Sequence, residues 1–183
     1  MTRLARATAA ALFAAVAIVS CGGTDTPPQP ATLAADAPQT QEEMRKRSEQ
    51  LLADTLAQLA PSLSLSLQPP PYSSAEPSNG SAVPCTNSAA DSPLIRVGTT
   101  YWVIGVPPGS AIAVQDRIMA AWRTLGWSVV REGANTVSAW TNDNYRFHLF
   151  RNGYDGLAIT LSSPCFPAGG ADGRPMSATV THP

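Results

Sequence analysis

The chain has 183 residues, of which 14% are charged, and its formal net charge is −1 at pH 7. This length fits one domain, or one domain with tails. So few basic residues build no basic stripe, and we therefore expect no nucleic-acid partner.

Residues 1–20 have the pattern of a bacterial signal peptide. Two arginines precede an apolar run, Ala7–Val19. These thirteen residues are too few to cross about 30 Å of hydrocarbon as a stable helix, but they fit a signal sequence. The run ends in Ile18-Val19-Ser20-Cys21, which resembles the lipobox of bacterial lipoproteins. The resemblance implies cleavage before Cys21 and a diacylglycerol on its thiol. The alternative is an ordinary signal peptide followed by a free cysteine.

A lipid on Cys21 would place the mature chain on the outer, extracytoplasmic face of the cell membrane, since two acyl chains anchor a protein stably. Residues 21–40 are rich in Pro, Thr and Ala and have no apolar period, which is typical of a disordered tether. Such a tether spans about 25 Å as a random coil and would hold a domain away from the lipid headgroups.

The chain contains three cysteines, an odd number for an exported protein. If Cys21 carries the lipid, Cys85 and Cys165 remain as one pair outside the cell, where disulfides persist. Each of the two follows a proline in a loop-like context. We therefore predict a Cys85–Cys165 disulfide, with two free thiols as the alternative.

Residues 41–60 predict an amphipathic helix. Thr40 followed by Glu43 forms a capping-box pattern, and apolar residues recur at helical spacing up to Pro61. The apolar stripe needs a partner, which is the protein's own domain, a membrane surface or another protein. The mixed charge of its polar face argues against a helix in the membrane interface. Residues 61–93 then form a Pro/Ser-rich loop, although Leu63, Leu65 and Leu67 alternate with serines as in a strand.

Residues 94–166 form the predicted folded module. Ala111–Leu125 has a helical period, with Ser110 as the expected N-cap and Gly126 as the C-terminal glycine. Residues 167–183 are predicted to be a disordered tail. The predicted strands are Ile95–Val106, Trp127–Arg131, Thr136–Thr141, Tyr145–Arg151 and Leu157–Ser163.

The fold class that follows is α+β: an antiparallel-rich sheet of βαβββ type with one helix packed on one face. The residues expected between the sheet and this helix are Phe147, Leu149, Ile159 and Leu161, with Val114, Ile118, Trp122 and Leu125. The alternate residues form a second, mixed face, on which we place Arg146, His148, Trp102 and Trp140 as candidate binding residues. Either the helix of residues 41–60 covers this second face, or the face is open and binds something.

The layout resembles uncharacterised small lipoproteins of actinobacteria, in which a lipobox and tether precede a helix and a sheet module. The matching stretches are Tyr101–Val106, Ala120-Ala121-Trp122 with Leu125-Gly126-Trp127, and Ser162–Cys165. The resemblance covers most of the mature chain, and its motifs are packing and turn signatures. It implies a surface lipoprotein with a terminal Ser-Pro-Cys and implies no activity.

No complete catalytic, metal or cofactor motif is present in the sequence. There is no G-x-S-x-G, and His148 has no second His or Cys at ligand spacing. Pro107–Ser110 lacks the glycine spacing and the lysine of a phosphate loop. We therefore expect a non-enzymatic binding module for an envelope protein or a cell-wall glycan. The alternative is a small-ligand carrier with a cleft between the N-terminal helix and the sheet.

Overall fold

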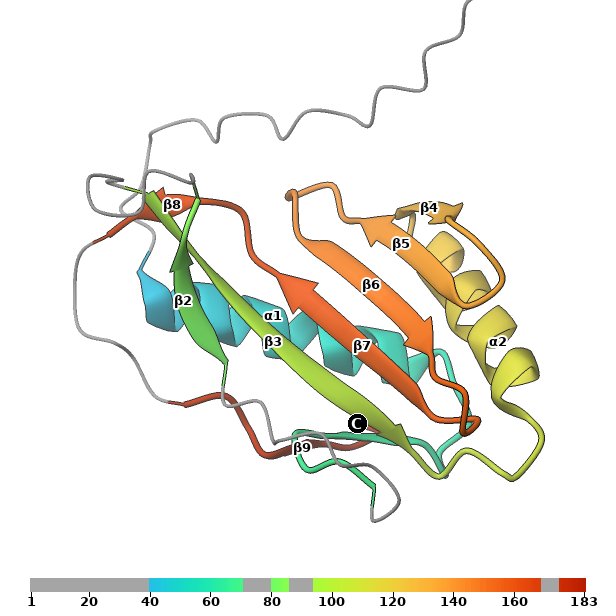
Figure 1. Ribbon diagram of the computed structural model, residues 1–183. Helices are drawn as coiled ribbons and strands as arrows, with labels where there is room; N and C mark the ends of the chain where they lie inside the picture. Colours follow the sequence, from blue (N-terminus) through green and yellow to red (C-terminus); the bar gives the residue numbers. More distant parts are fainter. Residues whose placement is uncertain (1–39, 71–79, 86–93, 169–174) are drawn as a thin grey trace, which may run out of the picture.

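The computed structural model describes residues 40–70, 80–85, 94–168 and 175–183 (Figure 1). The predicted signal peptide, Cys21 and nearly all of the predicted tether lie outside these residues. Within them the chain forms two helices and a nine-stranded sheet whose paired strands are all antiparallel. The elements are α1 (Gln41–Ala57), β1 (Ser64–Ser66), β2 (Ser81–Pro84), β3 (Leu94–Ile104), α2 (Ala111–Thr124), β4 (Ser128–Arg131), β5 (Thr136–Trp140), β6 (Arg146–Arg151), β7 (Leu157–Ser162), β8 (Phe166–Pro167) and β9 (Thr179–Val180). The predicted α+β class is confirmed.

The sheet has the order β4-β5-β6-β7-β3-β1-β9, and the eleven-residue β3 is its longest strand. β7 and β8 pair along one edge of β3, and β1 and β2 pair along the other. β3 ends at Ile104, two residues before the predicted end. There Gly105 takes a φ of +85°, and a Cβ at this position would collide with the carbonyl oxygen of Ser62. Only glycine fits this close approach of β3 to the segment before β1.

The predicted capping box begins α1. The Thr40 hydroxyl accepts a hydrogen bond from the Glu43 amide (3.2 Å), and the Glu43 carboxylate accepts one from the Thr40 amide (2.8 Å). Two polar side chains on the buried side, Ser48 and Thr55, donate to carbonyl oxygens one turn earlier in the helix. The apolar stripe of α1 can therefore be buried without leaving these hydroxyls unpaired.

A Schellman motif ends α2. The amide of Gly126 donates to Arg123 O and the amide of Trp127 donates to Trp122 O, both at 3.0 Å, with Gly126 at a φ of +78°. The predicted C-terminal glycine is thereby confirmed. Ser110 stands at the N-cap, but its hydroxyl donates to Pro107 O rather than accepting from the helix amides. The side chain thus stabilises the turn before α2 and does not cap the helix.

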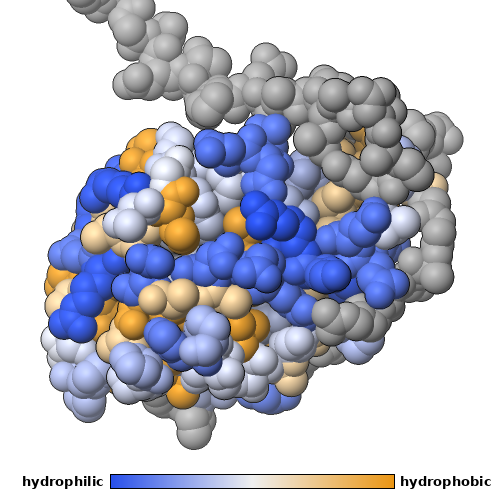
Figure 2. Space-filling view, turned by 180° about the vertical axis from the view of Figure 1, so that it is seen from behind, coloured by the Kyte–Doolittle hydropathy of each residue, from blue (hydrophilic) through white to orange (hydrophobic). Residues whose placement is uncertain are grey.

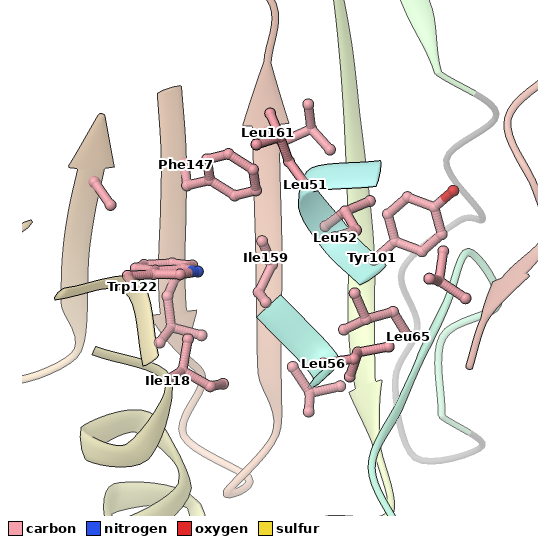
Figure 3. Packing of buried hydrophobic residues seen from close by; sticks show 14 of the residues in the cluster. Leu51, Leu52, Leu56, Leu65, Tyr101, Ile118, Trp122, Phe147, Ile159 and Leu161 are labelled. Carbon is pink, nitrogen blue, oxygen red and sulfur yellow. The ribbon is translucent and has the colours of Figure 1, made fainter. Parts of the chain in front are cut away.

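Both helices lie on the same face of the sheet, behind the strands as they are seen in Figure 1. Trp122 of α2 donates its indole N–H to the Thr55 hydroxyl of α1 (3.1 Å), so the two helices are side by side. Figure 3 shows the core between helices and sheet, with Leu52 and Trp122 facing Ile159 and Phe147. The outer side of this layer is largely hydrophilic (Figure 2). The amphipathic stripe of α1 is therefore buried on its own domain.

The predicted interior of the module is confirmed. Phe147, Leu149, Leu161, Ile118 and Trp122 are fully buried. Ile159 and Val114 are nearly so, and Leu125 is partly buried at the edge of the cluster. Because alternate residues of a strand face opposite sides, this register also decides which residues face away from the helices.

The sheet extends beyond the predicted module at both ends. Strand β1 lies in the predicted loop, where the Leu/Ser alternation indicates it, and β2 lies there too. The predicted disordered tail is wrong for its last residues, because β9 pairs with β1, and Met176 and Val180 are buried. The alternation that indicates β1 extends beyond its three residues, whereas β2 and β9 show no such pattern, so only their pairing reveals them.

Candidate functional site

The four candidate binding residues lie on one face of the sheet, the face opposite the helices. Cross-strand pairing sets Trp140 beside Arg146, His148 between Ser138 and Thr160, and Trp102 beside Ala158. No described residue of α1 or α2 packs over this face, which is turned toward the viewer in Figure 1. We call it the open face. The alternation of β6 thus separates buried Phe147 and Leu149 from Arg146 and His148.

The structure does not bring all four residues into one site. Trp102 is only 8% exposed and makes an edge-on contact with Phe150, with 6.5 Å between the ring centroids. Phe150 is four residues along β6 from Arg146, about 13 Å at roughly 3.3 Å per residue. Trp102 therefore belongs to an apolar cluster at the far end of the open face, whereas Trp140 and Arg146 form a separate site.

His148 lies in the middle of the open face, half-buried, within a polar network. Its Nδ1 is 2.9 Å from the Ser138 hydroxyl, which donates in turn to Glu132 Oε1 at 2.6 Å. Burial, and to a lesser extent the positive charge of Arg146, lowers the pKa of His148 against the opposing effect of Glu132. Ser138 is fully buried, so its hydroxyl is not placed as an exposed nucleophile would be. The network holds the ring of His148 in place.

A cleft of about 740 Å³ lies where the open face meets two turns at the end of the sheet. Its floor is one cross-strand row on β4 to β7, namely Ser128, Trp140, Arg146 and Ser162. Arg96 of β3 and Trp127, the residue before β4, also line the cleft. The walls are the β5–β6 turn, through Thr141, Asn142 and Asn144, and the segment Ser163–Cys165 after β7.

Arg146 is held against an aromatic ring inside this cleft. Its guanidinium carbon is 5.5 Å from the centroid of the Trp140 ring, within cation–π distance. The two residues are direct neighbours across β5 and β6, so the pairing of the strands sets their contact. A guanidinium stacked in this way loses less conformational entropy when it binds a ligand.

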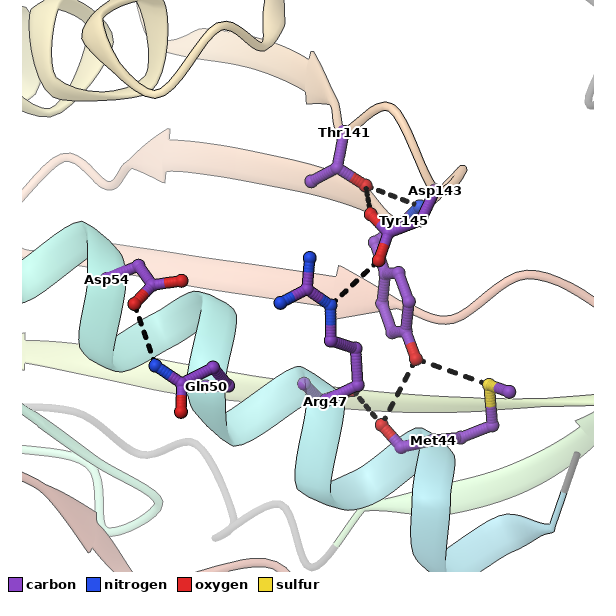
Figure 4. Close-up of polar contacts among 8 residues, drawn as sticks. Met44, Arg47, Gln50, Asp54, Thr141, Asp143 and Tyr145 are labelled. Atoms are coloured by element: carbon purple, nitrogen blue, oxygen red, sulfur yellow. Dashed lines mark hydrogen bonds and ion pairs between the residues drawn. The ribbon is translucent and has the colours of Figure 1, made fainter.

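The acidic residue of the β5–β6 turn does not line the cleft. Asp143 lies between the two asparagines of the β5–β6 turn, yet it forms an ion pair with Arg47 of α1 at 2.7 Å and accepts from the Thr141 hydroxyl at 2.6 Å (Figure 4). Burial alone would raise the pKa of Asp143, but the hydrogen bonds from Arg47 and Thr141 outweigh it and hold the pKa below its usual value. The carboxylate of Asp143 is thus ionised, its charge is balanced by Arg47, and it faces α1.

One of the two disulfide cysteines, Cys165, is part of the cleft wall. Cys85 and Cys165 form a disulfide with 6.2 Å between their Cα atoms, and Cys165 lines the cleft. The amide of Cys85 also donates to Leu94 O at the start of β3. The predicted disulfide therefore joins the segment after β2 to the segment after β7, and it holds one side of the cleft.

Sequence reasoning found Trp140 and Arg146 but missed the rest of the cleft. Arg96, Ser128 and Ser162 come from three strands whose spatial order no local pattern gives. Alternation does place Arg96 on the same face as Trp102, six residues along β3. That signal could have added Arg96 to the candidate face, but it could not have shown Arg96 close to Arg146.

The described residues contain no group of three or more His, Cys, Asp or Glu side chains that could hold a metal ion. None of the helices in this part of the chain is long and apolar enough to cross a membrane. Comparison of the chain with family models, curated proteins and solved structures finds no match. A function for this chain is therefore proposed from the geometry of the cleft.

Proposed function

We propose that this chain is a non-enzymatic binding module of the cell envelope, held on the outer face of the cell membrane by a lipid on Cys21. The cleft lined by Arg96, Trp140 and Arg146 is the observation that carries the proposal. Its volume falls in the range of ligand sites, and it combines aromatic rings with a few polar groups. It also opens on the face that neither helix covers, where a large partner could approach.

Of the two predicted partner classes, a cell-wall component fits the cleft better than an envelope protein. A protein partner usually buries a broad patch with an apolar centre. The open face instead presents Thr100, Thr160 and Ser162 along its middle, and the two threonine hydroxyls are 2.8 Å apart. A glycan strand needs hydroxyl and amide partners with an aromatic surface, which the cleft supplies through Asn142, Asn144 and Trp140.

The alternative function, a carrier with a ligand between the N-terminal helix and the sheet, has less support. The residues of α1 that would line such a cleft pack directly on the strands, since Leu51 is 2% exposed and Leu52 and Leu56 are 0% exposed. A ligand there would have to displace the core. The cleft on the opposite side of the sheet needs no such rearrangement.

The proposed anchor can be tested independently of the cleft. We expect the mature wild-type protein to partition into detergent, and Cys21→Ala to block processing or release the protein from the membrane. The measurement is Triton X-114 phase separation with a mass determination of the N-terminal peptide. A Cys21→Ala protein that matures and remains on the membrane would contradict the anchor.

The proposed binding can be tested by sedimentation of the detergent-solubilised full-length protein with isolated cell-wall sacculi. Trp140→Ala should reduce the affinity for sacculi about tenfold or more, because buried aromatic anchors dominate binding energies. Tyr154→Ala is the matched control, since Tyr154 is an aromatic residue that is 80% exposed and lies outside the cleft. Wild-type protein that stays in the supernatant, or equal losses in the two variants, would count against cleft binding.

A further inference from the structure

The cleft has a local charge opposite to that of the whole chain. Among the described residues, its lining includes Arg96 and Arg146 and no Asp or Glu, whereas the chain as a whole has a formal charge of −1. Positive charge in a concave site focuses the field and raises the local concentration of anions. The ligand of this cleft should therefore carry negative charge.

The two arginines are available to a ligand. The ion pairs among the described residues are Arg47–Asp143 and Arg131–Asp116, and neither involves Arg96 or Arg146. Arg146 is already positioned by Trp140, so its planar guanidinium can bind a carboxylate or a phosphate with little further ordering. Arg96 lies two strands away from Arg146 along the sheet, and it is two residues along β3 from Gly98, which faces Ser162. The two cations thus line the cleft from the strands on either side of β7.

The β5–β6 turn keeps the cleft free of competing charge. Three consecutive residues, Asn142-Asp143-Asn144, form most of this wall, but only the two neutral amides line the cleft. Asp143 points to the other side and is neutralised by Arg47 (Figure 4). If Asp143 faced the cleft it would pair with Arg146 and cancel the positive charge. The Arg47–Asp143 pair therefore contributes to the selectivity of the site although neither residue lines it.

The remaining lining is suited to a polyhydroxylated molecule. Ser128, Ser162, Asn142 and Asn144 offer both hydrogen-bond donors and acceptors, and Trp140 lines the same cleft. Such a mixture satisfies the hydroxyl groups and the apolar faces of a sugar ring at the same time. A nucleic acid, which needs a long basic stripe, does not fit two arginines in one cleft.

We propose that the cleft binds an acidic saccharide, with its carboxylate or phosphate oxygens between Arg96 and Arg146 and its hydroxyl groups on the serines and asparagines. This proposal rests on the proposed function, because it names the chemistry of the envelope component that the module holds. A sugar carboxylate and a sugar phosphate present the same oxyanion to the guanidinium groups, so the experiment must separate these two sources.

The experiment uses the full-length protein in detergent and three preparations of sacculi. The first is untreated, the second has its carboxylates converted to amides by carbodiimide and ammonia, and the third is freed of phosphodiester-linked polymer by hydrofluoric acid. We expect strong binding to untreated sacculi and at least a tenfold loss with one of the two treatments. The sensitive treatment identifies the anion. Binding should also weaken as salt is added, because salt screens charge interactions.

Substitutions of the two cleft arginines test whether the anion binds in the cleft. Arg96→Gln and Arg146→Gln should each lower the affinity for untreated sacculi about tenfold, which is the order contributed by a charge-assisted hydrogen bond. Arg117→Gln, an equal change of charge on an exposed position of α2, should leave the affinity unchanged. Arg146→Lys keeps the charge but loses the planar contact with Trp140, so it should fall between wild type and Arg146→Gln. Thermal melts establish that each variant is folded.

The outcomes separate this inference from the function on which it rests. Sacculi that bind equally after both treatments, with Trp140→Ala still deficient, would overturn the acidic saccharide and leave the binding module standing. Equal losses in Arg117→Gln and Arg146→Gln would likewise overturn it, because the effect would then reflect overall charge. Absence of binding to untreated sacculi would remove the proposed function and the inference together.

Discussion

The two faces of the sheet are built from the same strands, but one packs against the helices and the other is open. On β6, Phe147 and Leu149 are fully buried beneath the helices, whereas their neighbours Arg146 and His148 lie on the open face. Two helices cover the first face, and no described element covers the second. Because successive residues of a strand face opposite sides of the sheet, one residue can stabilise the core while the next is available for binding. Substitutions at adjacent positions should then have unlike effects.

The largest effect on stability is expected from loss of the Cys85–Cys165 disulfide, which joins two segments of the chain at the edge of the cleft. Its cysteines are separated by 80 residues. On the chain-entropy model, a loop of this length contributes about 4 to 5 kcal/mol to stability. Replacing both cysteines by serine should lower the free energy of unfolding by about that amount, as measured by urea denaturation. Because Cys165 lines the cleft, the same variant should also bind sacculi more weakly.

A chemical measurement checks the disulfide without mutation. The denatured but unreduced protein should show no alkylation at Cys85 or Cys165, and both should be alkylated after reduction. Mass spectrometry of the two peptides distinguishes these states. Two alkylated cysteines before reduction would mean that the pair is not bonded and that the cleft wall is held by other contacts.

The comparison of faces is tested most directly by two neighbouring residues. Phe147→Ala should cost about 3 to 5 kcal/mol, because the ring is fully buried against Trp122 and Trp127, with centroids 5.6 Å and 4.8 Å away. Arg146→Ala should cost less than about 1 kcal/mol, as is usual for an exposed position. Equal losses in paired melts would show that Arg146 is structural, and the cleft would lose its principal cation.

Local patterns predicted the elements that are long and regular. The period of Ala111–Leu125, the glycine after it and the Thr40–Glu43 capping box each determine a structure within a few residues, and all three are confirmed. The disulfide followed from the odd number of cysteines, which left one pair once Cys21 was assigned to the lipid. These inferences needed no knowledge of which strands are neighbours.

The position of α1 and the composition of the cleft could not be predicted in this way. The apolar stripe of α1 shows that the helix is buried, but it does not say on which face of the sheet. The cleft depends on the order β4-β5-β6-β7-β3, which brings Arg96 near Arg146 although they are 50 residues apart. The side to which Asp143 turns depends on Arg47, a residue of α1. Each of these is a long-range contact.

A charged residue of α1 is buried on the covered side of the sheet. Arg45 of α1 is only 7% exposed, and its Nε and Nη1 atoms have no hydrogen-bond partner. Unpaired buried donors destabilise a fold, so Arg45→Met should raise the free energy of unfolding by about 1 kcal/mol. Lys46→Met, at the exposed neighbouring position, should change it by less than about 0.5 kcal/mol. A loss of several kcal/mol in Arg45→Met would reveal a partner for the guanidinium.

The smallest effect is expected on the open face, from the titration of His148. Burial and Arg146 lower the pKa of His148 in the folded protein below its usual value of about 6.5. As the pH falls, the unfolded chain therefore takes up the proton before the folded chain does, and stability decreases below about pH 6.5. His148→Gln should remove this part of the slope between pH 7 and pH 5, as measured by denaturation of the variant and the wild type in parallel. If the variant keeps the wild-type slope, His148 is equally basic in the folded and unfolded states, and neither burial nor Arg146 perturbs its charge.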